Sequence, residues 1–212
     1  MSILLKYGWY ALLIAIFGDM LIPFIIAPFY KGYRHTEMTI SALGNPKSPV
    51  RVPFNIWMLI EGILLLLSVP AIYDYYISVS KSFVIIVVAF FVIFAVGACI
   101  FTCFFSVNET KDEITTASKI HGFGSVIGFM LFLFVPLLLS ILEFKKGNNI
   151  VGIISAISFA FSLLFFVLFV MADKPDFKNT IIAKEGLWQR FNLLFMYLPL
   201  AVISFRNLFF VN

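Results

Sequence analysis

Six apolar stretches divide this chain, and each is long enough to cross a lipid bilayer as a helix. A helix needs about 20 predominantly apolar residues to span the hydrocarbon of a membrane. The links between the stretches are too short for a soluble domain. The sequence therefore predicts an all-α, polytopic membrane protein, in which residues 1–212 form a single bundle of six transmembrane helices. The expected spans are residues 7–30, 54–76, 83–107, 120–142, 150–171 and 187–211.

The composition supports a membrane protein and argues against other classes. Apolar residues make up 62% of the chain and charged residues only 12%, whereas soluble domains are about a quarter charged. The first stretch is too long for a cleaved signal peptide, carries Asp19 and is followed by no small-residue cleavage site. Because the basic residues are dispersed along the links rather than clustered, the net charge of +4 predicts no nucleic-acid partner.

Alternation of the spans assigns the links to two sides of the membrane. We call the side with both termini the terminal face, and the side with residues 31–53, 108–119 and 172–186 the loop face. Ten of the 15 lysine and arginine residues lie on the loop face, and a literal count would make that face cytoplasmic. The loop face is also about twice as long and carries seven acids, so the charge pattern alone does not decide the orientation.

Polar side chains gather near the loop face and predict a binding pocket there. Glu61 lies eight residues beyond Pro53, which is about 12 Å into the membrane. A carboxylate at that depth needs a partner or a water-filled cavity. Arg190 enters from the same face, so we expect an ion pair between Arg190 and Glu61. The residues expected to form the pocket are Arg34, His35, Ser41, Asn55, Glu61, His121, Gln189 and Arg190.

Asp19 is a second intramembrane acid and a functional candidate in its own right. It precedes Pro23, which disturbs the backbone hydrogen bonds of the first span. The structural alternatives remain open for the other residues. Glu61 with Arg190 is more often a structural bridge than a catalytic pair, and His35 and His121 suit a polar–apolar boundary.

Two patterns of small residues predict helix packing. Gly124 and Gly128 form a Gly-x-x-x-Gly face that lets two helices approach closely. Small residues four or three apart recur on the fifth span, where we expect a packing seam of Ser155, Ser158 and Ser162.

Short motifs recur in the links between the spans. They are Gly-Tyr-Arg-His at residues 32–35, Thr39 to Gly44, Ser106 to Glu109 before Ser118, His121-Gly122, and Gly186 to Arg190. These motifs resemble those of the prokaryotic six-helix membrane family known as domain of unknown function 998, and the resemblance spans essentially the whole chain. The Ile-Ser-x-x-Gly loop and the later His-Gly also resemble, more faintly, the Frag1/DRAM/Sfk1 membrane proteins.

These resemblances imply a membrane location but no catalytic residues. The Frag1/DRAM/Sfk1 group is linked to lipid remodelling and phosphoinositide organisation, and the resemblance implies an N-terminus inside the cell. We therefore expect a multi-pass protein of the cell membrane whose N-terminus and C-terminus are both cytoplasmic. The motif-bearing loops would then lie outside.

Three functions are compatible with these residues. The first is binding or handling of a membrane lipid, with Arg34, Arg51 and Arg190 near headgroup phosphates, because arginine binds phosphate with two parallel hydrogen bonds. The second is a membrane-embedded hydrolase or transferase acting on a lipid-like substrate, with His35 or His121 as base and Ser41 or a water as nucleophile.

The third function is a small ion-coupled transporter that uses Asp19 and Glu61, although no inverted repeat is detectable. The sequence contains no nucleophile elbow. It also lacks the ligand spacing of a metal site, because Cys99 and Cys103 are too few ligands on one helix face. We therefore expect no metal and no cofactor. Membrane lipid is the expected partner, and the sequence points to no protein partner.

Overall fold

The computed structural model describes residues 3–108 and 114–210, and all regular structure in those residues is helical. Glu109 of the second loop motif and Val211 at the end of the sixth predicted span lie outside the described residues. The α-helices are α1 (Ile3–Ile26), α2 (Arg51–Ile77), α3 (Lys81–Phe94), α4 (Phe101–Phe104), α5 (Thr116–Phe132), α6 (Val135–Lys145), α7 (Asn149–Met171) and α8 (Glu185–Phe209). Between them lie the 3-10 helices η1 (Ala27–Phe29), η2 (Ile40–Gly44), η4 (Pro175–Phe177) and η5 (Ile181–Ala183), and the π-helical segment η3 (Ala95–Ile100).

The prediction of six membrane spans is confirmed. Every end agrees with the predicted stretch to within four residues, the largest difference being Thr116 against the expected residue 120. The third span is built from α3, η3 and α4, and the fourth from α5 and α6. The helices long and apolar enough to cross a membrane are Leu5–Phe29, Arg51–Ile77, Lys81–Phe104, Thr116–Lys145, Asn149–Met171 and Glu185–Phe209.

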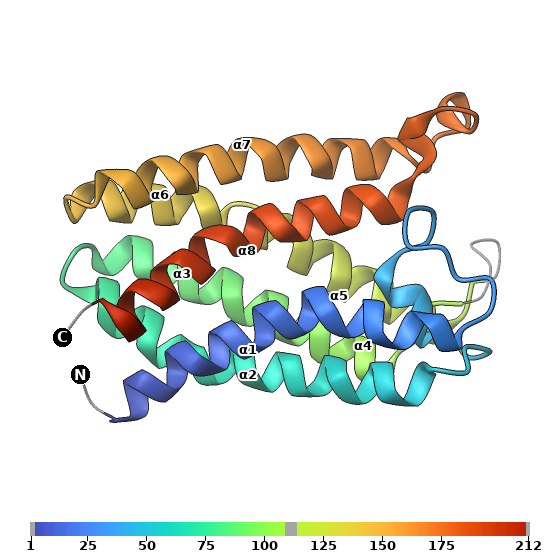
Figure 1. Ribbon diagram of the computed structural model, residues 1–212, viewed down its shortest axis with the longest axis horizontal. Helices are drawn as coiled ribbons and strands as arrows, with labels where there is room; N and C mark the ends of the chain where they lie inside the picture. Colours follow the sequence, from blue (N-terminus) through green and yellow to red (C-terminus); the bar gives the residue numbers. More distant parts are fainter. Residues whose placement is uncertain (1–2, 109–113, 211–212) are drawn as a thin grey trace.

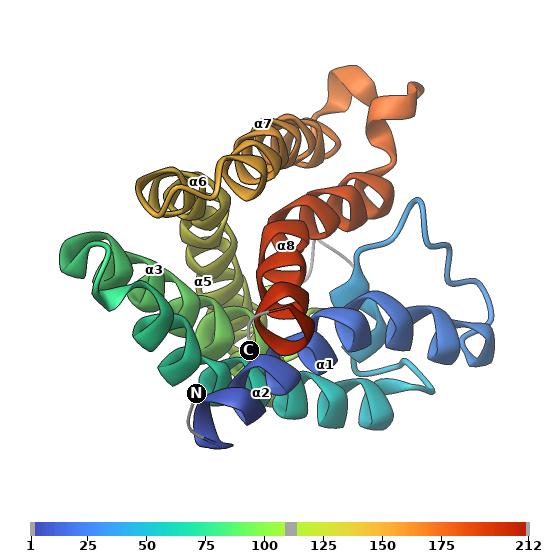
Figure 2. The ribbon, with the colours of Figure 1, turned by 60° about the vertical axis from the view of Figure 1, so that its left-hand side comes forward.

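The spans run side by side, and their connections collect at two opposite ends (Figure 1). Both termini and the short turns α2–α3 and α6–α7 lie at one end, which is the terminal face. The three longer connections lie at the other end, which is the loop face. α1 packs between α2 and α8, α5 packs on α3 and η3, and α7 packs on α6 and α8 at the edge of the bundle (Figure 2).

Proline divides the fourth span into two helices. The ring of a proline inside a helix collides with the carbonyl group four residues earlier. Pro136 would meet the carbonyl of Phe132, and α5 ends at Phe132. α6 then restarts at Val135 with Pro136 in its first turn, where a missing N–H has no cost. α6, the half of the span nearer the terminal face, can therefore pack on α7 while α5 packs on α3 and η3.

Glycines permit a close contact between α5 and η3, as the Gly-x-x-x-Gly pattern predicts. A Cβ atom added to Gly124 would lie 2.7 Å from the carbonyl oxygen of Gly97, and one added to Gly128 would lie 3.2 Å from Cβ of Ala98. The two backbones touch because neither glycine has a side chain. This contact fixes α5 against the π-helical turn η3, and both elements line the cavity described below.

The serine stripe of the fifth span is a packing seam, as predicted. Ser155, Ser158 and Ser162 are all buried, and α7 packs along α8. The amide of Asn192 donates to the carbonyl oxygen of Ser162 at 2.8 Å. The remaining faces of α7 are largely exposed and apolar, which suits a helix surrounded by lipid.

A separate polar cluster lies at the terminal face, around the buried carboxylate of Glu143. Tyr76 donates its hydroxyl hydrogen to Oε1 of Glu143, and Asn148 donates to Oε2 at 2.7 Å. The guanidinium of Arg206 lies 3.9 Å from the same carboxylate and donates to Asn148 at 2.8 Å. These bonds tie α2, α6 and α8 together, and this cluster was not among the residues singled out from the sequence.

Candidate functional site

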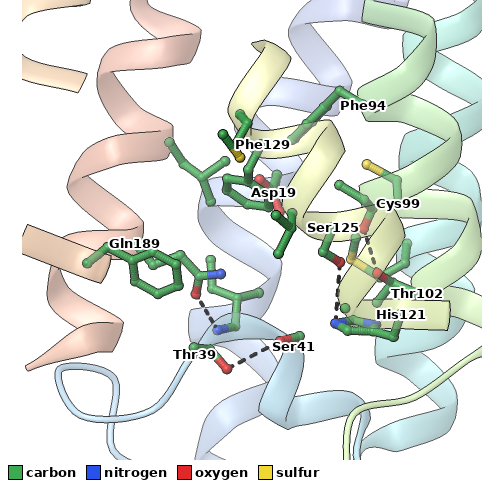
Figure 3. Close-up of a pocket in the computed structure, with 18 of the residues that line it drawn as sticks. Asp19, Thr39, Ser41, Phe94, Cys99, Thr102, His121, Ser125, Phe129 and Gln189 are labelled. Atoms are coloured by element: carbon green, nitrogen blue, oxygen red, sulfur yellow. Dashed lines mark hydrogen bonds between the residues drawn. The ribbon is translucent and has the colours of Figure 1, made fainter. Parts of the chain in front are cut away.

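A cavity of about 510 Å³ extends from the loop face toward the middle of the bundle. Figure 3 shows side chains from α1, η2, η3, α5 and α8 converging on it. Its walls are mostly apolar, and a small number of polar groups point inward, as is usual for ligand sites. The polar or ionisable residues that line it are Asp19, Thr39, Ser41, Glu61, Cys99, Thr102, His121, Ser125 and Gln189.

Two buried carboxyl groups meet at the inner end of the cavity. Asp19 of α1 and Glu61 of α2 are 4% and 1% exposed. The hydroxyl oxygen of Tyr197 on α8 lies 3.1 Å from Oδ2 of Asp19 and 3.2 Å from Oε1 of Glu61. Asp19 lies ten residues before Phe29 and Glu61 ten residues after Arg51, so both acids sit about 15 Å from the loop face.

One hydroxyl group serves both acids. A phenol carries a single hydrogen, so the bonds that Tyr197 donates to Asp19 and to Glu61 share it. Two carboxylates this close and this deeply buried do not both stay charged without a cation between them. The inner end therefore calls for a proton on one of the acids or a cation between the two.

His121 and Ser125 form the wall of the cavity on α5 (Figure 3). Nδ1 of His121 lies 3.0 Å from the carbonyl oxygen of Phe105. Because a carbonyl only accepts, Nδ1 carries the hydrogen and Nε2 is left as an acceptor. The Ser125 hydroxyl lies 3.4 Å from Nε2. The two side chains are thus placed like the nucleophilic serine and the histidine base of a hydrolase. Here, however, a backbone carbonyl orients the imidazole, where a hydrolase often uses a carboxylate.

The 3-10 helix η2 closes the cavity at the loop face and is held by the first turns of α8. Gln189 accepts a hydrogen bond from the backbone N–H of Ile40 at 2.7 Å. Arg190 donates to the carbonyl oxygens of His35 at 2.6 Å and Met38 at 3.2 Å. A Cβ atom on Gly186 would lie 2.2 Å from the Met38 oxygen. Gly186, Gln189 and Arg190 of α8 therefore hold the first loop in place.

Arg190 also binds two side chains of the first loop. Its Nη2 atom donates to the hydroxyl of Tyr33 at 2.6 Å and lies 3.3 Å from Nδ1 of His35. The imidazole of His35 stacks on Phe24 with 4.4 Å between ring centroids. Partial burial, reinforced by the charge of Arg190, lowers the pKa of His35 below its ordinary value. Burial raises the pKa of Tyr33, although Arg190 opposes that shift.

The structure separates the predicted pocket residues into two groups. Ser41, Glu61, His121 and Gln189 line the cavity, and so does Asp19. The other group surrounds the cavity without lining it. Arg34 is exposed and pairs with Glu37 at 2.5 Å, His35 and Arg190 belong to the loop contacts, and Asn55 packs under Gly44.

The expected ion pair between Arg190 and Glu61 is wrong. The guanidinium of Arg190 is occupied by carbonyl oxygens of the first loop, and Glu61 is bonded to Tyr197 instead. Both residues enter the bundle from the loop face, as expected. Arg190 nevertheless lies close enough to Asp19 for its charge to act on that acid.

The cavity opens sideways toward the surrounding bilayer, between α5 and α7. Val126 of α5 and Val170 of α7 both line the cavity and are 57% and 48% exposed. Extensive contacts join α5 to α3, η3 and α4, and α7 to α6 and α8; among the described residues none of comparable extent joins α5 to α7 or α8. The apolar residues at this opening are Val126, Phe129, Met130, Phe166, Phe169 and Val170.

Several site residues were missed from the sequence. Tyr197 connects the two acids, yet it is one aromatic among many on an apolar span. Cys99, buried beside Glu61 on the π-helical turn, was interpreted from the sequence only as a packing residue. Ser125 was different, because its spacing of four from His121 puts both on one helix face, and the two side chains do meet.

No cluster of three or more histidine, cysteine, aspartate or glutamate side chains within residues 3–108 and 114–210 is placed to hold a metal ion.

The comparisons with known proteins yield a family but no characterised relative. No curated protein and no solved structure matches the sequence. The model of one family, described as "Protein of unknown function (DUF998)", matches residues 13–206. That match covers nearly all of the 212 residues and includes at least part of every span, and it shows that this six-helix membrane protein belongs to the DUF998 family.

Proposed function

We propose that the protein binds or handles a membrane lipid or a similar amphiphile, which enters the cavity sideways from the bilayer. The observation that carries this proposal is the opening between α5 and α7. Exposed apolar residues on both helices continue directly into the cavity wall. An acyl chain can lie along these residues while its polar end reaches the inner groups, because apolar walls with a few polar groups orient an amphiphile.

The arginines expected to meet headgroup phosphates do not support that part of the hypothesis. None of the three, Arg34, Arg51 and Arg190, lines the cavity. The polar end of the ligand would instead meet Gln189, Ser41 and His121 near the loop face, or the acids further in.

Bound lipid provides the test. The purified protein is extracted in a mild detergent, and co-purifying molecules are identified by mass spectrometry. Val170→Trp fills the opening, whereas Val167→Trp adds the same side chain one turn away, at a position that is equally exposed (46%) but outside the cavity. We expect Val170→Trp to remove the bound lipid and Val167→Trp to retain it. Equal lipid content in both variants would contradict the proposal.

A membrane-embedded hydrolase is the second candidate, favoured by the contact between His121 and Ser125 at the cavity wall. Ser125 would be the nucleophile and Nε2 of His121 its base. The test is release of fatty acid from a labelled phospholipid by the purified protein. Loss of release in both Ser125→Ala and His121→Gln, with normal lipid content in both, would favour catalysis over binding.

An ion-coupled transporter is the third candidate, supported by the two buried acids, Asp19 and Glu61, that bond the same tyrosine hydroxyl. Such a protein would carry protons across vesicle membranes when its substrate is supplied. Proton uptake into proteoliposomes that Asp19→Asn abolishes would favour transport, and an amphiphile that binds without any proton movement would count against it.

We also propose that the protein lies in the cell membrane with both termini in the cytoplasm. The family motifs on the loops support this orientation, whereas the literal count of basic residues opposes it. Reporter fusions to the C-terminus and to the α7–α8 connection test it. Cytoplasmic activity of the loop fusion and external activity of the terminal fusion would reverse the assignment.

A further inference from the structure

We infer that the inner end of the cavity binds a protonated amine, so that the amphiphile taken up is cationic. This inference rests on the proposed function and names the chemical class of the ligand. Among the described residues that line the cavity, Asp19 and Glu61 carry ionisable acids, and none is a lysine or an arginine. An anionic headgroup would therefore meet like charge, which is unfavourable in a medium of low dielectric constant.

An unused acceptor points to the ligand. Oε2 of Glu61 is buried and makes no hydrogen bond to any described residue, although Glu61 faces the cavity. The thiol of Cys99 lies beside this carboxyl, but a thiol is only a weak donor. Buried carboxylate oxygens without a partner are costly and uncommon. A donor supplied by a ligand would complete the coordination of Glu61.

An ammonium group matches both the charge and the donors of this site. Because two buried carboxylates this close disfavour a double charge, one of them protonated leaves the pair with one negative charge, which a single ammonium neutralises. An ammonium has three hydrogens, so it can bond Oε2 of Glu61 and still reach Asp19. Arg190 does not compete for the same place, because its guanidinium is bound to the carbonyl oxygens of the first loop.

The apolar part of such a ligand fits the outer half of the cavity. Phe129 and Met130 of α5 face Phe166 and Val170 of α7 across the lateral opening. A hydrocarbon chain extending from the acids toward the bilayer would pass between these residues. The cavity thus combines an anionic inner end with an apolar exit, which selects molecules that are both cationic and hydrophobic.

The test uses three probes with the same alkyl chain, measured on the full-length protein in phosphatidylcholine nanodiscs by calorimetry. Empty nanodiscs give the background from partitioning into lipid. We expect dodecylamine to bind most tightly, dodecanol more weakly and dodecyl sulfate not above background. Glu61→Gln should weaken dodecylamine by about tenfold or more, since it removes a charge-assisted contact, and should leave dodecanol unchanged. Glu143→Gln, which alters the buried acid at the terminal face, should leave all three probes unchanged.

The pH dependence of dodecylamine binding tests the role of the acids. A primary ammonium has an ordinary pKa of about 10.4, so dodecylamine stays charged at and below neutral pH and any change in its affinity there reports on the protein. Protons compete with the cation for the acids, so the affinity should fall as the pH is lowered. The titratable and charged groups that face the site or act on it are Asp19 of α1, Glu61 of α2, Cys99 of η3, His121 of α5, and Arg190 and Tyr197 of α8.

The outcomes separate this inference from the proposed function. If dodecanol binds, Val170→Trp blocks it and dodecylamine has no advantage, the cavity takes amphiphiles but the assignment to amines is wrong. If no probe binds above empty nanodiscs, or if Val170→Trp affects none of them, the proposed function itself fails. Asp19→Asn is a second variant, measured alongside Glu61→Gln in case one of them does not fold. The inference is overturned if the variants that fold bind dodecylamine as tightly as the unchanged protein.

Discussion

Arg190 donates to the backbone carbonyl oxygen of His35 at 2.6 Å, although the two residues are 155 positions apart in the sequence. The bond joins the first connection of the bundle to the beginning of its last span. Arg190 also binds Met38, Gly186 and Tyr33. A charge that is partly removed from water is stabilised when its donors are used, and here the two Nη atoms hold the loop that closes the cavity.

Replacing Arg190 by lysine should release this loop. Lysine keeps the charge but loses the planar fork that reaches several acceptors at once. We expect Arg190→Lys to lower the free energy of unfolding by about 2–4 kcal/mol and to speed hydrogen exchange of residues 33–41. Arg34→Lys is the matched control, because Arg34 is exposed and its guanidinium pairs with the side chain of Glu37. Its effect should stay below about 1 kcal/mol, and equal effects of the two changes would contradict the role given to Arg190.

The sequence was sufficient for the spans but not for the contacts between them. Hydropathy locates each helix along the chain, and the proline rule explains the break before Pro136. Depth in the membrane also follows from residue spacing, so the expected depth of Glu61, about 12 Å from the loop face, agrees with its place about 15 Å below that face. The direction in which a side chain points around its helix depends on how six helices pack together, and this is why Arg190 meets His35 instead of Glu61.

Tyr197 could not be identified as a site residue from the sequence, for the same reason. One tyrosine on an apolar span gives no sign that its hydroxyl bonds two acids from two other helices. Asp19 was identifiable because an acid inside a membrane is rare, whereas an intramembrane tyrosine is not. The lateral opening was equally hidden, because it arises from the separation of α5 and α7 and not from any local motif.

Adding a methyl group at Gly186 should displace the loop. The new Cβ would lie 2.2 Å from the Met38 oxygen and 2.5 Å from the His35 oxygen, and neither backbone atom can move without breaking the bonds of Arg190. We expect Gly186→Ala to cost about 1–3 kcal/mol. Gly122→Ala is the control, since nothing lies within 4 Å of its added Cβ and alanine favours the helix. Denaturant titrations in detergent compare the two, and a stable Gly186→Ala protein would show that the loop is not held as described.

The loop contacts should weaken in acid through His35. The pKa of His35 lies below its ordinary value of 6.5 because of burial and the charge of Arg190. The released loop binds a proton more readily than the bound loop, so the bound form loses stability as the pH falls through 6.5 and keeps its full stability above it. A nitroxide on Thr36→Cys, in a Cys103→Ser background, should become more mobile below that pH. His35→Gln should remove the pH dependence, and a mobility that changes equally in that variant would assign the effect to another group.

Tyr197→Phe should destabilise the bundle at its centre. The change removes the hydroxyl that lies 3.1 Å from Asp19 and 3.2 Å from Glu61, and leaves both buried acids without this partner. We expect a loss of about 1–3 kcal/mol in the free energy of unfolding. Tyr73→Phe removes a hydroxyl from a residue that is 38% exposed, and it should change stability by less than about 0.5 kcal/mol. Unfolding titrations of both variants at the same pH measure the difference. If Tyr197→Phe is as stable as Tyr73→Phe, the two acids do not depend on the tyrosine, and each must be satisfied by water entering from the cavity.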